Sequence, residues 1–579
     1  MNIAHCRRGV CALAILGGVL LVYGATINGA GAQEVTAERL NNAQREPHNW
    51  LVYGGTYASQ RYSALDQVNT DNVNQLKVSW AFQTGVIDAG LQSTPLVADG
   101  VMYVTSNNNH VFALDATNGR VLWKYFYEPK KADASAPVSV SRGLALGHGH
   151  VYFGTESDNF VVALDVATGK EVWRTNVEDK GEFGCSIRNA PLIVKDMVVV
   201  GGRIGDTGHR GHLVAFDGKT GKQRWRFDVI PGPGEKGHES WGGSRDWLLG
   251  GGAPWTTGSY DPELNLIYWG TSNPSSDFYG GNRKGDNLYT NSIVALDGNT
   301  GTIRWHFQTV PHDVWDYDGV YECILADMMV NGRPRKLLMQ VGKSGYVYVI
   351  DRTNGEYVAG WKYAENVTWS SGLDNRGIPL DRNEPVTDKF KLICPNYFGA
   401  RSWNEATFSP KTGLLYNTAI EWCGEYRARE QRTERAKGNL GGTVRMVPPP
   451  SGKVTAHLDA FDPLTGRRVW HHDAKHPLLA GLTSTAGDLV FTGDPEGHFF
   501  ALDAKTGRQL WSFQTGSGHR GGSISYGVNG KQYVATASGW GSTLAGRLGE
   551  FFPELVSAPG GSTVFTFALP DTPASSRAR

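Results

Sequence analysis

Short apolar runs that end in a polar turn recur along this chain, and they predict a protein built of β-hairpins. In each copy a run rich in Val, Leu and Phe ends in Ala-x-Asp, and a Gly and then a Trp follow at fixed spacing. An Asp side chain accepts hydrogen bonds from turn amides and Gly tolerates positive φ, so each copy predicts a turn between two strands. The second strand carries the Trp. The copies are Ala113–Trp123, Ala163–Trp173, Ala215–Trp225, Ala295–Trp305, Ala460–Trp470 and Ala501–Trp511.

The spacing of the copies predicts how the hairpins are grouped. The first three begin at Ala113, Ala163 and Ala215, and this period of about 50 residues is typical of four-stranded propeller blades. Asp351–Gly355 repeats the turn without the Trp, and Ser409–Gly413 is interpreted as the remnant turn of a worn blade. We therefore expect an all-β fold, an eight-bladed β-propeller with Trp side chains docked between neighbouring blades.

Three segments do not follow the repeat. Phe565–Leu569 is expected to be a strand that closes the ring against an early blade. Residues 231–291 are dense in Gly, Pro, Trp and Asn, and insertions of this kind on a rigid scaffold usually carry function. Glu425–Lys453 is expected to be a mobile loop, either as the rim of a substrate entrance or as a disordered excursion.

The N-terminus predicts export. Arg7 and Arg8 precede the apolar run Val10–Tyr23, and small residues follow as far as Ala32. Residues 1–32 are therefore expected to be a signal peptide, and residues 33–579 one propeller domain in the periplasm. The apolar run is too short to span a bilayer. With 56 basic and 56 acidic residues, the chain shows no excess positive charge for nucleic acid.

Cysteine usage adds two expectations. Four Cys remain after the signal peptide, and an exported protein is expected to form a disulfide, with Cys394 and Cys423 as the preferred pair. Whether Cys185 and Cys323 are free or paired stays open. The sequence contains no C-x-x-C-H motif, so it encodes no covalent c-type haem.

The strongest candidate for chemistry is the stretch Pro311–Val320, which holds Asp313, Asp316 and Asp318. In an extended segment Asp316 and Asp318 would project to the same face, where their like charges repel. Two interpretations remain open. The stretch is either a solvated turn or a site where a multivalent hard cation such as Ca²⁺ neutralises the carboxylates.

Taken in order, the motifs resemble one family. The Trp repeats, Trp255 after a Gly run, Asn273 in Ser-Asn-Pro, Pro311–Gly319 and Gly539-Trp-Gly541 together resemble the pyrroloquinoline quinone (PQQ) alcohol dehydrogenases. The resemblance covers nearly all of residues 45–570. It implies an eight-bladed propeller that holds PQQ and one metal ion in its central funnel.

The resemblance also implies roles for individual residues. The PQQ-binding residues would be Gln92, Arg142, Arg188, Arg203, Trp255, Lys343 and Trp540, and the metal ligands Asp206, Asn273, Asp316 and Asp318. An Asp at position 318 is similar to the lanthanide-using members, and an additional anionic oxygen suits a trivalent ion. A lanthanide is therefore favoured, with calcium as the alternative. Some positions depart from the family: Asp206 replaces a Glu, Ser402 replaces an Asn, and Ala136-Pro137 replaces an adjacent Cys pair.

These assignments predict a periplasmic enzyme that oxidises an alcohol to an aldehyde or ketone. The metal would polarise the C5 carbonyl of PQQ, and Asp316 would act as the catalytic base when hydride moves to that carbon. The expected electron acceptor is an external periplasmic cytochrome c, and association into a homodimer is left open. Two alternative functions remain: a PQQ-dependent sugar or aldose dehydrogenase, and a non-enzymatic propeller that scaffolds outer-membrane assembly.

Overall fold

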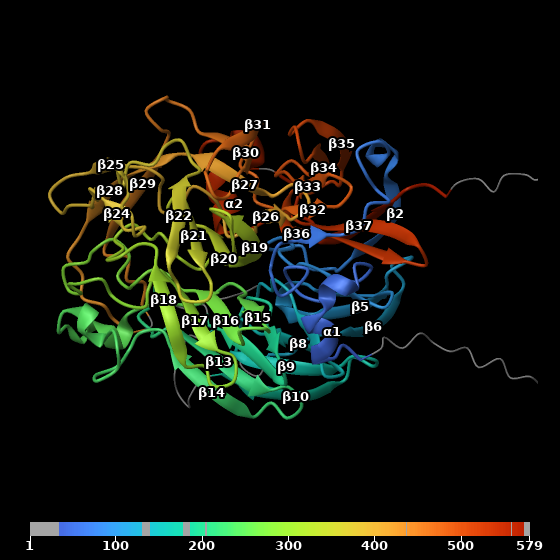
Figure 1. The fold of residues 1–579 in the computed structure, drawn as a ribbon, viewed down its shortest axis with the longest axis horizontal. Helices are drawn as coiled ribbons and strands as arrows, with labels where there is room; N and C mark the ends of the chain where they lie inside the picture. Colours follow the sequence, from blue (N-terminus) through green and yellow to red (C-terminus); the bar gives the residue numbers. More distant parts are fainter. Residues whose placement is uncertain are drawn as a thin grey trace, which may run out of the picture. The chain divides into compact units, whose positions relative to one another are not determined.

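The computed structural model describes residues 34–129, 139–177, 186–202, 205–435, 437–556 and 558–571. The proposed signal peptide, Cys185 and Arg203 lie outside these residues. The regular secondary structure of the described residues is mostly β-strand, as expected, and their α-helices are α1 (Ala37–Asn41) and α2 (Thr543–Leu548) (Figure 1). No helix in the described residues has the length and apolar character needed to cross a membrane. Short 3-10 helices lie at Ala43–Arg45, Val73–Gln75, Asn107–Asn109, His238–Trp241, Arg245–Leu249 and Pro553–Leu555.

Within the described residues, the strands form eight sheets of four or five strands, of which five follow one another directly along the chain. The first comprises β3 (Leu96–Ala98), β4 (Val101–Thr105), β5 (Val111–Asp115) and β6 (Val121–Tyr125). The second comprises β7 (Ala145–Gly147), β8 (His150–Gly154), β9 (Phe160–Asp165) and β10 (Glu171–Asn176). The third comprises β11 (Leu192–Val194), β12 (Met197–Gly201), β13 (His212–Asp217) and β14 (Gln223–Asp228). The fourth comprises β15 (Ser259–Asp261), β16 (Leu266–Gly270), β17 (Ser292–Asp297) and β18 (Ile303–Gln308). The fifth comprises β19 (Ile324–Val330), β20 (Arg333–Val341), β21 (Tyr346–Asp351) and β22 (Tyr357–Lys362).

The other three large sheets join segments that are more distant in sequence. One comprises β26 (Thr407–Ser409), β27 (Leu414–Glu421), β30 (Thr455–Phe461) and β31 (Arg468–Ala474), so Ser409–Gly413 is a turn between two of its strands, as expected. The next comprises β1 (Tyr62–Ser63), β32 (Thr483–Thr485), β33 (Leu489–Gly493), β34 (His498–Asp503) and β35 (Gln509–Gln514). The last comprises β2 (Lys77–Gln83), β38 (Thr563–Ala568), β37 (Lys531–Ser538) and β36 (His519–Val528).

The last sheet joins the two ends of the described chain. Strand β38 pairs with β37 on one side and with β2 on the other, both antiparallel (Figure 1). The predicted strand at Phe565–Leu569 is therefore confirmed as β38. Its partner β2 lies near the N-terminal end, so the first and last large strands of the described chain share one sheet.

The repeat Trp side chains connect successive sheets. The Trp123 Nε1 donates to the Val166 carbonyl at 3.0 Å, and a Cβ added at Gly169 would lie 2.4 Å from the Trp123 ring. Gly is therefore required at that position both for its positive φ and for the close approach of the indole. The same Trp–Gly contact recurs in Trp80–Gly119, Trp173–Gly221, Trp225–Gly301, Trp305–Gly355, Trp361–Gly466 and Trp470–Gly507.

The segment Glu425–Lys453 is not the mobile or disordered loop that its composition predicted. It contains most of β28 (Cys423–Ala428) and all of β29 (Gly442–Val447), which pair in a three-stranded sheet with β25 (Lys391–Ile393). Two of its arginines contact one aromatic ring, because the Arg427 and Arg445 guanidinium carbons lie 4.6 and 4.2 Å from the centroid of the Phe390 ring. A further two-stranded sheet, β23 (Gly372–Leu373) and β24 (Pro379–Leu380), precedes it.

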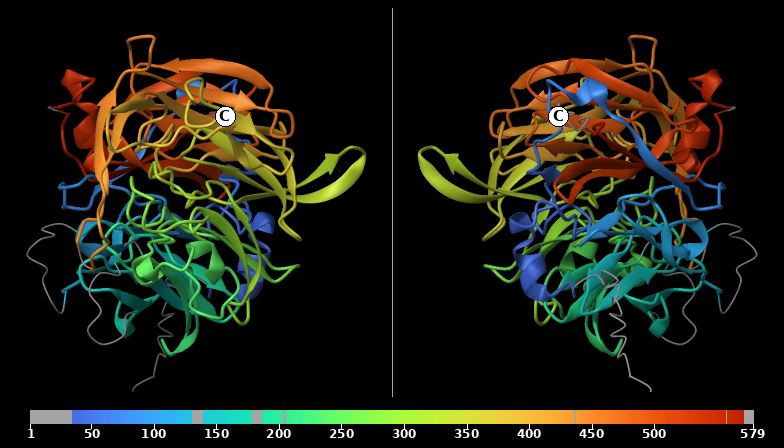
Figure 2. Two further views of the ribbon diagram at one scale, coloured as in Figure 1. Left: turned by 90° about the vertical axis from the view of Figure 1, so that its left-hand side faces the viewer. Right: turned by 90° about the vertical axis from the view of Figure 1, so that its right-hand side faces the viewer.

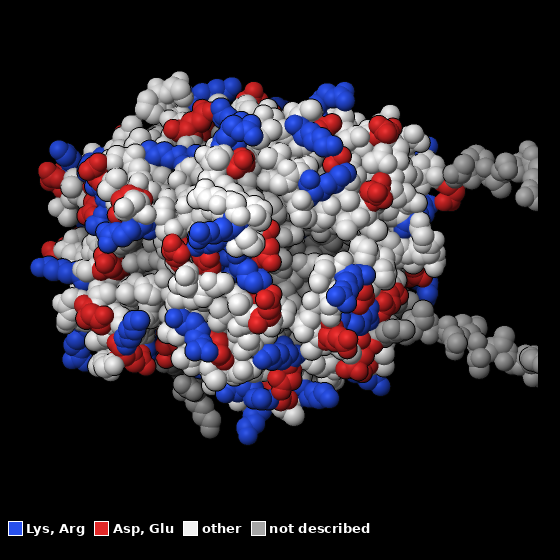
Figure 3. Space-filling model, in the orientation of Figure 1, with Lys and Arg blue, Asp and Glu red and all other residues white. Residues whose placement is uncertain are grey.

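The exterior shows one prominent projection and a mixed charge distribution. The hairpin of β19 and β20 extends away from the neighbouring strands, with Met329 near its tip 61% exposed (Figure 2). On the face shown in Figure 3, Lys and Arg side chains are interspersed with Asp and Glu. That face therefore offers no extended field of one sign.

A buried histidine links two strands of the β26–β31 sheet electrostatically. The His457 Nε2 lies 3.1 Å from Glu421, and its Nδ1 lies 2.8 Å from Asp459. Burial alone would lower the pKa of His457, but Asp459 and Glu421 outweigh it and raise the pKa to about 9.

This raised pKa makes stability depend on pH. The folded protein binds the proton more tightly than the unfolded chain, so the stabilisation is complete below about pH 6.5 and is lost as pH rises through about 9. We expect this contribution to the free energy of unfolding to be about 3 kcal/mol. Urea unfolding of the wild type and His457→Gln at pH 6 and pH 10 measures it. An equal difference at both pH values would contradict the assignment.

Candidate active site

The loop Pro311–Val320 follows β18, and Asp313 shapes it. The Asp313 carboxylate accepts the backbone N–H groups of Trp315 and Tyr317, each at 2.8 Å, and the side-chain amide of Asn291 at 2.9 Å. Asp313 is fully buried. The turn interpretation therefore holds for Asp313, for which the sequence indicated no function of its own.

This turn places Asp316 in an unusual conformation. Asp316 has φ +65°, in the left-handed region that few residues other than Gly, Asn and Asp adopt readily. The backbone is held there by the Asp313 cap on both sides of it. As a result Asp316 and Asp318, two residues apart, both line one cavity.

We expect Asp313→Ala to destabilise the fold. The variant leaves two buried N–H groups and the Asn291 amide without their acceptor, which lowers the free energy of unfolding by roughly 3 kcal/mol. Asp313→Asn keeps one acceptor oxygen and should lose less. Urea denaturation of the two variants tests this order, and equal stability of Asp313→Ala and the wild type would contradict the capping role.

Lys343 joins the two carboxylates. Its Nζ lies 2.8 Å from the Asp318 Oδ2 and 3.2 Å from the Asp316 Oδ1. Burial would lower the pKa of Lys343, but the two carboxylates outweigh it and raise the pKa well above its usual value. Asp318 also accepts the Trp255 indole N–H at 3.3 Å. Lys343 is thus a fixed cation between two fixed anions.

A further carboxylate, Asp277, was not identified from the sequence. The Asn273 Nδ2 donates to the Asp277 Oδ1 at 3.1 Å and lies 3.5 Å from the Asp206 Oδ1, so Asn273 stands between two acids. Burial is the largest cause that raises the pKa of Asp277, and repulsion by nearby carboxylates adds to it. The carboxylates that repel it are those of Asp206, Asp316 and Asp318.

The four carboxylates therefore gather at one place with a single lysine. Burial raises the pKa of Asp316 well above its usual value; Lys343 opposes this rise, and the neighbouring carboxylates add to it. A donor set of several carboxylate oxygens and an amide, with more negative than positive charge, is the kind that binds a multivalent hard cation. The residues present thus fit the metal ion implied by the sequence.

The carboxylates open into a cavity of about 950 Å³. Of the proposed PQQ-binding residues, five line it, namely Gln92, Arg142, Arg188, Trp255 and Lys343. Trp540 does not line it: this indole is buried against Leu544, although the adjacent Gly541 reaches the cavity wall. Arg188 forms an ion pair with Glu156, which neutralises part of the positive charge that was predicted for the PQQ site.

Like Asp277, the cavity residues Trp403 and Arg520 escaped the sequence interpretation. The Arg142 guanidinium carbon lies 3.9 Å from the centroid of the Trp403 ring and 4.9 Å from that of Trp255. Arg142 therefore stacks between two indoles. The position of Trp403, directly after Ser402, was the only signal in the sequence that could have indicated it.

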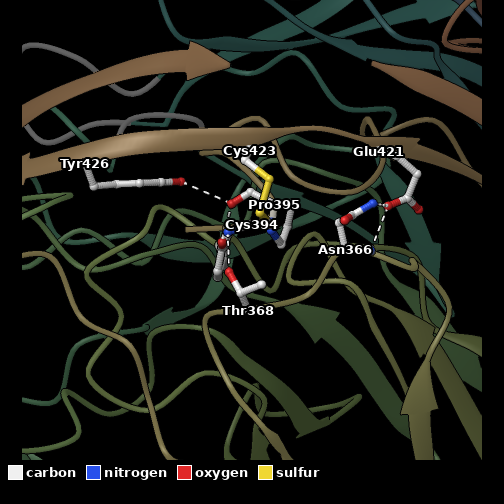
Figure 4. Close-up of a disulfide and its surroundings, with 8 residues drawn as sticks. Asn366, Thr368, Cys394, Pro395, Glu421, Cys423 and Tyr426 are labelled. Carbon is white, nitrogen blue, oxygen red and sulfur yellow. Dashed lines mark hydrogen bonds between the residues drawn. A yellow bond between two sulfur atoms is a disulfide. The ribbon is translucent and has the colours of Figure 1, made fainter. Parts of the chain in front are cut away.

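A disulfide lies in the segment that contacts this loop. Cys394 and Cys423 are bonded, as predicted, while Cys323 is free and buried (Figure 4). The residue after Cys394 is Pro395, whose carbonyl accepts the Tyr317 hydroxyl at 2.5 Å. Tyr317 lies between Asp316 and Asp318 in sequence, so the disulfide segment supports the loop that carries both acids.

A second cavity, of about 650 Å³, has the acids Asp261, Glu263 and Asp327 in its lining. Asp261 and Asp327 each lie 2.7 Å from Arg352, and Glu263 lies 2.8 Å from Lys336. Since these charges neutralise one another, the carboxylate-lined cavity is the stronger candidate for chemistry.

Comparison with known proteins shows what the chain is similar to. Residues 50–365 match the family described as glucose/ethanol/alcohol dehydrogenase, beta-propeller domain, and residues 454–546 match the outer membrane protein assembly factor BamB family. The chain is 35% identical to the quinoprotein alcohol dehydrogenase PedH of Pseudomonas putida, over 97% of each chain. It is 37% identical to the lanthanide-dependent methanol dehydrogenase of Methylacidiphilum fumariolicum, over 87% of each chain.

Solved structures agree. The quinohemoprotein alcohol dehydrogenase ADHIIG from Pseudomonas putida superposes with a TM-score of 0.86 at 34% identity, over 94% of this chain and 83% of that one. A europium-containing methanol dehydrogenase superposes with a TM-score of 0.84 at 34% identity, over 92% and 100%.

Proposed function

Because this chain belongs to the family of PQQ-dependent alcohol dehydrogenases, we propose that it oxidises an alcohol to an aldehyde or ketone with PQQ and one metal ion in the carboxylate-lined cavity. The observation that carries the proposal is the cluster of four carboxylates and Lys343. Trp255 and Arg142 stand beside it as a flat aromatic surface and a cation. These groups fit a planar polycarboxylate and its metal ion.

Within this proposal the residues have distinct tasks. When bound, PQQ supplies a hydride acceptor at its C5 carbonyl, and the metal ion acts there as a Lewis acid. Asp316 orients the alcohol and takes its hydroxyl proton. Asp206, Asn273 and Asp318 hold the metal ion together with Asp316, and Asp277, hydrogen-bonded to Asn273, supports that set.

The metal is proposed to be a lanthanide, with calcium as the alternative. Asp318 adds a carboxylate to the set, and Asp277 adds another close by, which favours a trivalent ion over a divalent one. Relatives named as lanthanide-dependent and europium-containing methanol dehydrogenases support this choice.

The architecture and location are proposals of the same kind. The eight sheets are interpreted as eight blades of a single domain, residues 33–579, with the Trp–Gly contacts docking one blade on the next. Residues 1–32 are proposed to direct export to the periplasm, and the disulfide suits that oxidising compartment. An external cytochrome c is proposed to accept the electrons.

The cavity wall bears on the substrate. Besides the charged cluster it presents apolar side chains from several elements, which suit the carbon chain of an alcohol better than a polyol. This favours an alcohol over the sugar or aldose alternative. The apolar lining residues are Phe278, Tyr397, Phe398, Leu440, Val444 and Leu544.

Reconstitution tests the proposal. The purified chain, freed of metal, is supplied with PQQ and La³⁺ or Ca²⁺ and assayed by dye reduction with panels of alcohols and aldoses. We expect turnover of alcohols only when PQQ and a metal are both present, with La³⁺ above Ca²⁺. Turnover confined to aldoses would favour the sugar dehydrogenase, and no turnover in any combination would return the scaffold interpretation.

A further inference from the structure

Arg520 is a buried cation with no acidic partner among the described residues. It is 1% exposed, is the second residue of strand β36, and lines the carboxylate-lined cavity. Burial lowers the pKa of Arg520 to about 9, and no carboxylate offsets this effect. A guanidinium remains charged in proteins, so a buried one needs a compensating partner.

The other fully buried arginines each have an acidic side chain nearby. Arg401 pairs with Glu322 at 3.0 Å, and Arg61 lies 3.7 Å from Glu405. Arg283 is close enough to Asp313 and Asp277 for both to raise its pKa. Among the described residues, Arg520 has no such acid.

The hydrogen bonds of Arg520 engage only one end of the guanidinium. Its Nη1 donates to the Ser402 Oγ at 3.3 Å, the Asn404 Oδ1 at 3.1 Å and the Leu479 carbonyl at 3.2 Å. Within the described part of the chain, Nη2 and Nε have no hydrogen-bond partner. The Nη1 contacts fix the plane of the group and leave a donor for a ligand.

Trp403 is close to a second guanidinium, that of Arg142. The guanidinium carbon of Arg520 lies 5.4 Å from the centroid of the Trp403 ring, and that of Arg142 lies 3.9 Å from it. Guanidinium groups therefore contact this indole from two different segments of the chain. A carboxylate matches the planar fork of a guanidinium and is the natural anion here.

We propose that Arg520, positioned by Ser402 and Asn404 beside Trp403, binds a carboxylate of the molecule that occupies this cavity. The assignment rests on the proposed function. Two sources share this chemistry: a carboxylate of PQQ itself, or the carboxylate of a hydroxy-acid substrate. In either case Arg520 supplies charge-assisted hydrogen bonds to that carboxylate.

The first measurement uses the protein without cofactor. If Arg520 serves a ligand, removing its uncompensated charge should not harm the empty protein, so Arg520→Gln and Arg520→Met should melt at or above the wild-type temperature. If both variants melt lower or fail to fold, Arg520 is a structural residue and the proposal is overturned.

The second measurement identifies the carboxylate. PQQ affinity is measured by equilibrium dialysis without alcohol, and KM is measured for 6-hydroxyhexanoate and 1-hexanol. Weaker PQQ binding by Arg520→Gln, by roughly tenfold or more, assigns the site to the cofactor. A tenfold higher KM for 6-hydroxyhexanoate alone, with PQQ binding unchanged, assigns it to the substrate.

Arg547→Gln is the matched control, because Arg547 lines the same cavity but is paired with Glu550 at 2.7 Å. It should leave both readouts within about twofold. If the wild type binds PQQ and Arg520→Gln matches it in both readouts, Arg520 does not bind the carboxylate, whereas the proposed function still stands. If the wild type does not bind PQQ, the proposed function fails and this assignment with it.

Discussion

Asp316→Asn is expected to abolish PQQ-dependent alcohol oxidation while the protein stays folded. Loss of a general base lowers turnover by about 10²–10⁴-fold, and Asp316 would also be lost as an anionic metal ligand, so the upper end of this range is expected. The loop should keep its shape, because Asn tolerates the left-handed conformation found at this position.

The experiment for Asp316 compares turnover, PQQ affinity and melting temperature with those of the wild type. Asp286→Asn is a suitable control, since Asp286 is exposed and the neighbouring contacts, from Gln308 and His312, use only its backbone carbonyl. Full activity of Asp316→Asn would sink the assignment. Lost activity with lost folding would point to a structural role instead.

One electrostatic consideration limits what the base can do. A carboxylate bound to a trivalent ion is a weaker base than a free one. Lys343, 3.2 Å from Asp316, acts in the same direction. Asp316 therefore contributes by orienting the alcohol as well as by accepting its proton. An Asp316 variant with a normal KM and a low kcat would fit the role of proton acceptor.

Asp318→Ala is expected to remove activation by lanthanides. The change deletes one anionic oxygen donor, so affinity for La³⁺ should fall by about 100-fold or more. Asp318 also pairs with Lys343 at 2.8 Å, so it has two roles to distinguish, metal ligand and partner of the lysine. If Asp318 is a metal ligand, its loss lowers the affinity for the metal. If it only pairs with Lys343, the affinity for the metal stays unchanged.

Luminescence of bound Tb³⁺, sensitised by the nearby Trp255, measures metal affinity directly without turnover. Asp318→Asn is the matched variant, since it preserves the shape and an acceptor for the Trp255 indole while removing the charge. We expect weak Tb³⁺ binding in both variants. Unchanged lanthanum dependence in Asp318→Ala would count against a lanthanide site that uses this residue.

The hairpins were predictable because their signal is local. An Asp, a Gly and a Trp at fixed spacing describe a turn and its packing partner, and the recurring Trp–Gly contacts use those residues. Trp361 escaped because it stands two positions beyond the place that the repeat assigns to the Trp. The strands in Glu425–Lys453 were missed because β28 pairs with β25, a partner that precedes Cys423 and has no repeat pattern, and β29 pairs only with β28.

The site was only partly predictable for a related reason. Asp316, Asp318 and Asn273 belong to ordered motifs, whereas Asp277, Trp403 and Arg520 acquire their neighbours through tertiary packing. An arginine in a Gly-rich stretch gives no sign of whether an acid will face it. Its missing counter-charge becomes visible only when all surrounding side chains are placed.

The pairing of β38 with β2 determines when the protein can complete its folding. Strand β2 leaves the ribosome among the first and β38 among the last, so the sheet that they share forms only when synthesis is nearly complete. Contacts between such distant segments make folding slow. A chain that cannot finish folding early stays unfolded long enough to pass through a translocation channel, so this late strand would couple the timing of folding to the proposed export.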